Sequence, residues 1–284
     1  MNNEKNKENA TPKPVSQPSE GSAAEYNHIK YVLAVMSGKG GVGKSFVTSL
    51  LATALARKGF EVGILDADIT GPSIPTLFGL HGPVESEETG IHPLKSLSGI
   101  KIISMNLLLA KEDLPIIWRG PLISKAIRQL WGDVMWGDLD YLLIDLPPGT
   151  ADVALTIMQS VPVNGIVMVT LPQGLSSLIV RKAVHMAQHI GVPIIGIIEN
   201  MSYFLCPDTQ KRYDLFGQSH AEEVAKAAGA PLLAVLPIDP NAATLCDQGK
   251  VEDIKLAEIE TAINSFILIN KLPRSKNDIK SKKS

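Results

Sequence analysis

The chain has 284 residues, of which 45% are hydrophobic, 5% aromatic and 20% charged, and its formal net charge is −2. This composition suits a globular protein with an aliphatic core, and the nearly neutral charge argues against a nucleic-acid or anionic-membrane ligand. Two cysteines are too few for a disulfide framework and no apolar run approaches the roughly 20 residues that span a bilayer, so we expect a cytoplasmic protein without a membrane anchor.

Polar segments without periodicity lie at both ends of the chain. Residues 1–27 are rich in Pro, Ser, Asn, Glu and Lys, which predicts a disordered tail, and they contain no apolar run typical of a secretory signal. Residues 272–284 are rich in lysine and are also expected to be loose. Between them, residues 28–271 show no internal repeat and no sign of a second domain, so we expect a single domain.

Continuous apolar runs alternate with amphipathic segments along this domain. Apolar runs without alternation indicate strands buried on both faces, and therefore a mainly parallel sheet. The predicted strands are 31–36, 62–65, 100–105, 141–145, 165–170, 193–199 and 231–237. The predicted helices are 45–58, 123–130, 176–190, 221–228 and 254–269. Helices that cross between parallel strands are typical of a doubly wound α/β fold, which is the fold class we predict.

A glycine-rich loop joins the first predicted strand to the first predicted helix. From Gly38 to Ser45 it fits the P-loop pattern G-x-x-x-x-G-K-[ST], in the strand–loop–helix context that the pattern requires. Glycines let backbone N–H groups turn toward phosphate oxygens, and the helix N-terminus adds its positive end. Lys44 is expected to reach the β- and γ-phosphates and Ser45 to bind Mg²⁺, so ATP and Mg²⁺ are the predicted cofactors. The other predicted nucleotide-binding positions of the loop are Lys39, Gly40, Gly41, Val42, Gly43 and Phe46.

Carboxylates follow two predicted strands, at the sheet edge where ligands bind in such folds. Asp145 ends an apolar strand, which is the place of a Walker B carboxylate that holds the magnesium shell. Asp66 and Asp68 end another strand and can orient a lysine, contact the metal's water molecules or position an attacking water. A strand-end aspartate is often only a turn former, but the nearby phosphate loop favours a functional role for all three.

Lys39, the second lysine of the loop beside Lys44, indicates a particular class of P-loop ATPase. The segment KGGVGKS resembles the deviant Walker A motif of the MinD/ParA/nitrogenase-iron-protein class of dimeric ATPases. The resemblance implies that Lys39 reaches the partner's nucleotide in a homodimer. It also implies that Asp68 aligns the hydrolytic water, with Asp66 in a supporting role, and that residues 71–73 and 147–150 are switch loops. Hydrolysis is expected to be slow and to depend on magnesium.

Phe46 departs from this pattern. Many relatives carry Thr or Ser after the Mg²⁺-binding serine, and that hydroxyl can meet the α-phosphate. A phenylalanine cannot make this hydrogen bond. We therefore expect weaker or altered nucleotide binding rather than its loss.

Six motifs occur in the order seen in the Mrp/ApbC family, and the resemblance covers about residues 30–269. They are SGKGGVGKS, DADITGPSIP, WRGP, DYLLIDLPPGTAD, ENMSYFLCP and LPIDP. The resemblance implies a cytosolic dimeric ATPase that carries iron–sulfur clusters and delivers them to apo-proteins. It also places base recognition at Asn200 and at the loop of Ile238, Asp239 and Pro240. An amide can donate to and accept from an adenine edge, although Asn200 could equally cap the following turn.

The family's cluster motif, C-P-x-C, is incomplete. Here it reads Cys206-Pro207-Asp208-Thr209, and threonine is a poor iron ligand. Two subunits would bring two thiolates, whereas a [4Fe–4S] cluster normally takes four. Cys246, expected on a later helix, and the side chains of Asp208 and His220 lack the spacing of known ligands. Two alternatives therefore stay open: a [4Fe–4S] cluster bound through Cys206, or a smaller or shared cluster.

Two functions from different classes follow. The first is an ATP-dependent carrier of iron–sulfur clusters, with apo-proteins as clients. The alternative is a cluster-free switch in positioning or regulation, like MinD. A membrane-bound switch would need a C-terminal amphipathic helix rich in lysine and arginine, but the polar face of residues 254–269 carries glutamates. We expect that helix to pack on the core instead.

Overall fold

The computed structural model describes residues 23–68, 71, 73–88, 90–104, 107, 120–149, 152–173 and 176–269. The two expected tails lie outside the described residues, apart from 23–27. There, a short 3₁₀ helix, η1 (Ala24–Tyr26), precedes the first strand. The buried Asn27 side chain donates to Val134 O at 2.8 Å and accepts from Gly137 N at 2.9 Å. Asn27 is therefore packed against the domain, and the division into a domain and two tails stays a prediction.

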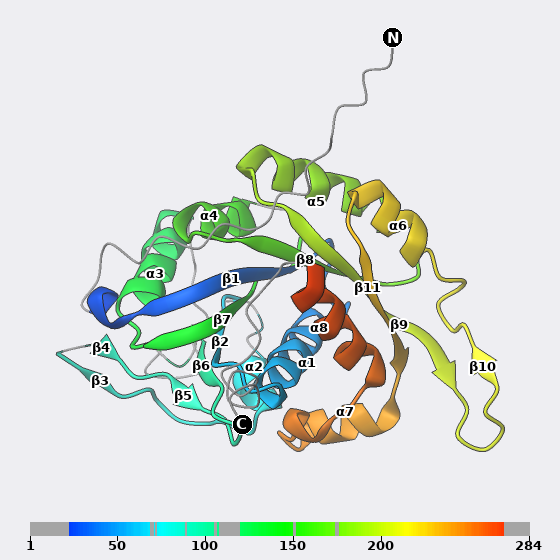
Figure 1. Ribbon diagram of the computed structural model, residues 1–284, viewed down its shortest axis with the longest axis horizontal. Coiled ribbons are helices and arrows are strands. Elements are labelled where there is room, and N and C mark those ends of the chain that lie inside the picture. The colour runs from blue at the N-terminus through cyan, green and yellow to red at the C-terminus, as the bar shows by residue number, and fades with distance from the viewer. Residues whose placement is uncertain are drawn as a thin grey trace, which may run out of the picture.

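A mainly parallel sheet forms the centre of the molecule (Figure 1). Its long strands lie in the order β11-β9-β8-β1-β7-β2-β6, and every neighbouring pair in this order is parallel. The strands are β1 (His28–Ser37), β2 (Val62–Asp66), β6 (Lys101–Ser104), β7 (Asp138–Asp145), β8 (Gly165–Thr170), β9 (Ile194–Leu205) and β11 (Leu232–Ile238). Each overlaps a strand predicted from a continuous apolar run, so the predicted sheet is confirmed.

Short antiparallel strands extend this sheet at its margins. β5 (Leu94–Lys95) pairs with β6, and β10 (Arg212–Tyr213) pairs with the far end of β9. β3 (Ser86–Glu87) and β4 (Gly90–Ile91) form a separate two-stranded ribbon. Two-residue strands are too short to show periodicity, which is why the sequence analysis does not predict them.

Helices cover both faces of the sheet, as Figure 1 shows. One face carries α1 (Lys44–Arg57), α2 (Ile74–Leu77), α7 (Pro240–Asp247) and α8 (Ala257–Ile269). The other carries α3 (Gly120–Gly132), α4 (Asp152–Ser160), α5 (Ser176–Ile190) and α6 (Ala221–Ala228). Within β1, Leu33 and Val35 pack into the first layer, while Val32, Ala34 and Met36 pack into the second. The strand is buried on both sides, and the predicted doubly wound α/β fold is confirmed.

The closing helix packs on the core, as predicted. Ile259 and Ile263 of α8 are buried in the layer that also contains α1. The helix begins at Ala257 rather than at residue 254, because Ile254 has an extended backbone after the 3₁₀ helix η3 (Val251–Asp253). Within the part of the chain that the structure describes, no helix combines the length and apolar character needed to cross a bilayer.

The register of the parallel strands brings several polar side chains to one edge of the sheet. Asp66 of β2 is the partner of Asp145 in β7 and of Ser104 in β6. Asp145 in turn lies beside Val35, two residues before the end of β1. The loop that follows β1 therefore begins next to these carboxylates, as expected at the carboxyl ends of parallel strands.

Candidate functional site

The loop between β1 and α1 depends on glycine at two positions. Gly41 and Gly43 have φ of 77° and 79°, in the left-handed region that side chains disfavour. A Cβ at Gly43 would also lie 2.3 Å from Asn200 Nδ2. Gly43 precedes α1 and offers no side-chain cap. The first N–H groups of α1 therefore lack a side-chain partner from this residue and can bind an anion.

A cavity of about 340 Å³ lies over this loop. It is lined by residues 37 and 39–46, together with Asp68, Gly71, Ser73, Leu77 and Pro148. Every predicted nucleotide-binding position of the loop except Gly38 thus lines the cavity. Phe46 and Leu77 contribute apolar wall and also pack against the buried core. The effect of Phe46 on nucleotide affinity stays a prediction.

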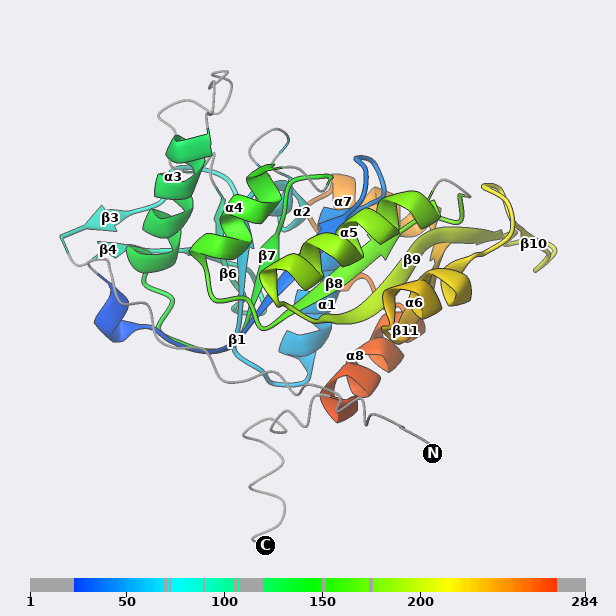
Figure 2. The ribbon, with the colours of Figure 1, turned by 90° about the horizontal axis from the view of Figure 1, so that it is seen from above.

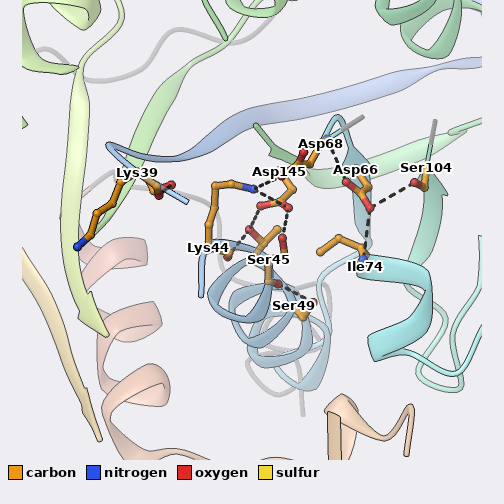
Figure 3. A network of polar contacts seen from close by, with 11 residues as sticks. Lys39, Lys44, Ser45, Ser49, Asp66, Asp68, Ile74, Ser104 and Asp145 are labelled. Atoms are coloured by element: carbon orange, nitrogen blue, oxygen red, sulfur yellow. Dashed lines mark hydrogen bonds and ion pairs between the residues drawn. The ribbon is translucent and has the colours of Figure 1, made fainter. Parts of the chain in front are cut away.

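The predicted phosphate and magnesium residues converge at this cavity. Lys44, Ser45 and Asp68 line it, and their side chains lie together with that of Asp145 (Figure 3). Lys44 Nζ lies 2.9 Å from Asp145 Oδ2 and 3.9 Å from Asp68 Oδ2. Ser45 Oγ donates to Asp145 Oδ2 at 2.5 Å. The Lys44 ammonium is buried and makes these ion pairs without a well-aligned hydrogen bond, so its donors can serve phosphate oxygens. A hydroxyl beside a carboxylate offers the oxygen ligands that Mg²⁺ prefers, and the residues present fit a magnesium–nucleotide complex.

Thr48, which was not predicted as a site residue, contacts the other oxygen of Asp145. The residue is fully buried on α1, one helical turn after Ser45. Its hydroxyl donates to Asp145 Oδ1 at 2.8 Å and lies 3.0 Å from Lys44 O. A threonine inside a helix gives no sequence signal for such a contact, because the two residues are distant in the chain and meet only in the fold.

Asp66 joins two strand ends to α2. Its Oδ1 accepts from Asp68 N at 3.1 Å, and its Oδ2 accepts from Ile74 N at 3.3 Å and from Ser104 Oγ at 3.2 Å (Figure 3). Burial, and then the charge of Asp145, raise the pKa of Asp66 to about 7. These contacts agree with the supporting role expected for Asp66, while its contact with a metal stays a prediction.

Both expected switch loops reach the cavity. Asp68, Gly71 and Ser73 line it on one side, and Pro148 lines it on another. Gly149 N donates to Ser37 O at 2.9 Å, which ties the second loop to the end of β1. Pro72 and Thr150 lie outside the described residues. A response of these loops to the γ-phosphate, and water alignment by Asp68, stay predictions.

Lys39 lines the cavity through its position in the loop, but its side chain points away from the carboxylates (Figure 3). Its Nζ donates to Oε1 of Gln173, which follows β8. The two lysines of the motif therefore have different partners. Lys44 pairs with Asp145 and Asp68, whereas Lys39 points away from these carboxylates and binds Gln173. No sequence pattern predicts Gln173 as the partner of Lys39.

The residues expected at the base lie outside the lining of this cavity. Asn200 is buried, and its Nδ2 donates to Val42 O at 2.9 Å, so the amide supports the phosphate loop from below. Ile238 ends β11, and Asp239 caps α7 by accepting from Asn241 N at 2.9 Å. None of these three predicted residues lines the cavity described above. Base recognition by them stays a prediction.

Cys206 lies in a tight turn between β9 and β10. Gln210 N donates to Cys206 O at 2.8 Å, and Cys206 N donates to Lys211 O at 3.0 Å. The Thr209 hydroxyl, followed by the backbone N–H groups of Thr209 and Asp208, donates hydrogen bonds that lower the pKa of the Cys206 thiol. The residue that replaces the second motif cysteine therefore polarises the first one.

The turn lies on a hairpin that projects from the edge of the sheet (Figures 1 and 2). Buried Glu199 anchors its base, since it accepts from the Ser202 hydroxyl and, at 3.3 Å, from His220 N at the start of α6. The hairpin and the segment after it carry most of the exposed large apolar side chains of the described chain: Leu205, Tyr213, Leu215 and Phe216.

Two other candidate iron ligands, Cys246 and His220, have different surroundings, while Asp208 lies in the same turn as Cys206. Cys246 lies on α7, where burial and then Asp247 raise the pKa of its thiol, and it packs against the core. His220 pairs with Glu223 at 3.4 Å. Over the described ranges, no group of three or more His, Cys, Asp or Glu side chains is placed to hold a metal.

Comparisons with known proteins agree with this geometry. The family model described as NUBPL iron-transfer P-loop NTPase, in the ParA group, matches residues 28–270. The iron-sulfur cluster carrier protein of Clostridium perfringens is 46% identical over 236 residues, which cover 80% of this chain and 83% of that protein. The protein of the same name from Methanocaldococcus jannaschii is 49% identical over 223 residues, or 78% and 77% of the two chains.

Solved structures of nucleotide-binding proteins also resemble this chain. The nucleotide-binding protein of Archaeoglobus fulgidus, in complex with ADP, superposes with a TM-score of 0.74 at 46% identity and covers 82% of this chain and 91% of its own. The septum site-determining protein MinD of Pyrococcus horikoshii, complexed with Mg-ADP, has a TM-score of 0.62 at 21% identity, covers 87% and 100%, and supports the fold alone. Sequence, fold and site agree, and the chain belongs to the NUBPL iron-transfer P-loop NTPase family.

Proposed function

We propose that the chain is a magnesium-dependent, slow ATPase that works as a cytoplasmic homodimer, carries iron–sulfur clusters and delivers them to apo-proteins. The observation that carries the proposal is the convergence of Lys44, Ser45 and Asp145 at one cavity. The chain is 46% and 49% identical to two relatives that are named iron-sulfur cluster carrier proteins.

At the nucleotide site, Lys44 exchanges its ion pair with Asp145 for the β- and γ-phosphates when ATP binds. Ser45 and Asp145 would hold a magnesium ion, which would neutralise phosphate charge. Asp68, 3.9 Å from Lys44 Nζ, lies beside the cavity where an attacking water would stand. Asp66 keeps this edge of the sheet in place.

The position of Lys39 is the argument for the proposed homodimer. Its side chain points away from the carboxylates of its own chain and donates to Gln173. In the dimer, Lys39 releases Gln173 and reaches the partner's nucleotide, where a second cation stabilises the charge that develops during phosphoryl transfer.

The Cys206 hairpin is the proposed cluster site. A low thiol pKa favours the thiolate, which is the form that binds iron. Two subunits supply two Cys206 thiolates, and a cubane cluster normally takes four, so the remaining ligands come from a client or from small-molecule thiols. The exposed apolar side chains around the turn offer a surface on which an apo-protein can dock.

A cluster-free switch is the second candidate. It is favoured by Thr209, which stands in place of the second cysteine of the motif. Under this alternative, ATP binding and dimer formation would act on a partner without iron.

Anaerobic reconstitution separates the two candidates. The protein is incubated with iron, sulfide and glutathione, and bound iron is counted in the wild type, Cys206→Ala and Cys246→Ala. A carrier binds about four irons per dimer for a [4Fe–4S] cluster, or about two for a smaller one, and loses them only with Cys206→Ala. Iron-free wild-type protein that still hydrolyses ATP would establish the switch instead.

A further inference from the structure

Three groups contact the two oxygens of the Asp145 carboxylate. Ser45 Oγ and Lys44 Nζ both contact Oδ2, at 2.5 Å and 2.9 Å. Thr48 Oγ alone of these three contacts Oδ1, at 2.8 Å. All of this lies in the interior, because Asp145 and Thr48 are both fully buried.

The Thr48 hydroxyl has one hydrogen and two acceptors within reach, Asp145 Oδ1 at 2.8 Å and Lys44 O at 3.0 Å. A carboxylate is the stronger acceptor, since hydrogen bonds to a charged oxygen are shorter and about twice as strong as neutral ones. The hydrogen therefore goes to Asp145, and α1 gains a fixed connection to the end of β7.

This connection matters when nucleotide arrives. In the proposed function, on which this inference rests, Ser45 turns to the metal and Lys44 turns to the phosphates. Asp145 then loses both of its contacts on Oδ2 and keeps Thr48 on Oδ1. We infer that Thr48 is a positioning residue: its hydroxyl holds the Asp145 carboxylate in the orientation in which Oδ2 faces the magnesium shell.

The test measures ATP affinity with magnesium and with a chelator in place of magnesium. Thr48→Val removes the hydroxyl at nearly constant shape, and Thr48→Ser retains it. Thr53→Val is the matched control, because Thr53 is also a buried threonine of α1 and its hydroxyl has no hydrogen-bond partner in the described structure. Thr48→Ala replaces the valine variant if that one does not fold.

We expect Thr48→Val to reduce the gain in affinity that magnesium brings by about 10- to 100-fold, the range seen when a partner of a metal ligand is removed. Affinity in chelator should stay unchanged, and Thr48→Ser and Thr53→Val should behave as the wild type. A purely structural role would instead lower both affinities together.

An unchanged magnesium response in Thr48→Val, beside a normal response in the wild type, overturns the inference and leaves the proposed function intact. Equal losses in chelator and in magnesium overturn it as well. If the wild type itself gains no affinity from magnesium, the proposed function fails, and the inference fails with it.

Discussion

At the scale of single residues, the substitution that weakens the cluster motif has a second effect. Thr209 removes a thiolate, yet its hydroxyl and backbone N–H stabilise the thiolate of Cys206. Cys246 has the opposite setting, since burial and the neighbouring Asp247 raise the pKa of its thiol. The two cysteines of the chain are therefore chemically distinct, which can be measured without iron.

We expect iodoacetamide to alkylate Cys206 before Cys246 at neutral pH, because only the thiolate reacts. Thr209→Val removes the hydroxyl that lowers the pKa of Cys206, so alkylation of Cys206 should slow, and its rate profile should shift to higher pH. Mass spectrometry of the two cysteine peptides over time gives both rates. Cys246 serves as the internal control, and a faster Cys206 in Thr209→Val would contradict the assignment.

Thr48, Gln173 and Glu199 show why some site residues could not be predicted. Each acts through a partner that the fold brings close: Asp145, Lys39 and the start of α6. Lys44, Ser45 and Asp145 could be predicted, because a glycine loop and a strand-end aspartate carry local patterns with fixed spacing. Asn200 is predicted to bind the base, and its Nδ2 donates to the loop backbone at Val42 O, a contact that no local pattern reveals.

At the scale of elements, the strands could be predicted because continuous apolar runs mark burial on both faces. The elements that the sequence patterns did not predict include α4, α2 and β10. α2 is a single turn whose first N–H is held by Asp66, and β10 is two residues held against the end of β9. Neither is long enough to show a period.

Asp66 is expected to make the free energy of unfolding depend on pH. Its pKa is about 7 in the folded state against an ordinary value of 3.8, so the folded protein binds more protons between these limits. The free energy of unfolding should therefore fall as pH rises from about 4 to about 7, by up to about 1.4 kcal/mol per pH unit from this group. Above that range, its contribution stays constant.

Urea unfolding of the nucleotide-free protein in chelator, at a series of pH values, measures this effect. Asp66→Asn cannot ionise, so its stability should rise relative to the wild type between pH 5 and pH 7. Asp253→Asn, at an exposed carboxylate, controls for the loss of one charge. Parallel pH profiles for the wild type and Asp66→Asn would show that Asp66 is ionised throughout.

At the scale of the whole molecule, the two functional regions lie at different places on the sheet. The nucleotide cavity follows β1, β2 and β7, near the middle of the strand order, while the Cys206 turn lies at the far end of β9. Asn200 connects them, because it belongs to β9 and binds the phosphate loop at Val42 O. One strand, β9, therefore contacts the phosphate loop and also ends at the hairpin.

The homodimer is tested through Lys39. In the presence of magnesium and a non-hydrolysable ATP analogue, we expect a dimer by analytical ultracentrifugation, and Lys39→Ala should weaken it by about tenfold or more, because a hydrogen bond to a charged group is lost. Binding of the analogue to one chain should change little, since Lys39 points away from its own carboxylates.

Gln173→Ala is the matched control for this test. It removes the partner that holds Lys39 within one chain, so the dimer should be as stable as in the wild type or more so. A Lys39→Ala dimer of undiminished stability would mean that the lysine serves only its own chain, where Gln173 already accounts for its position.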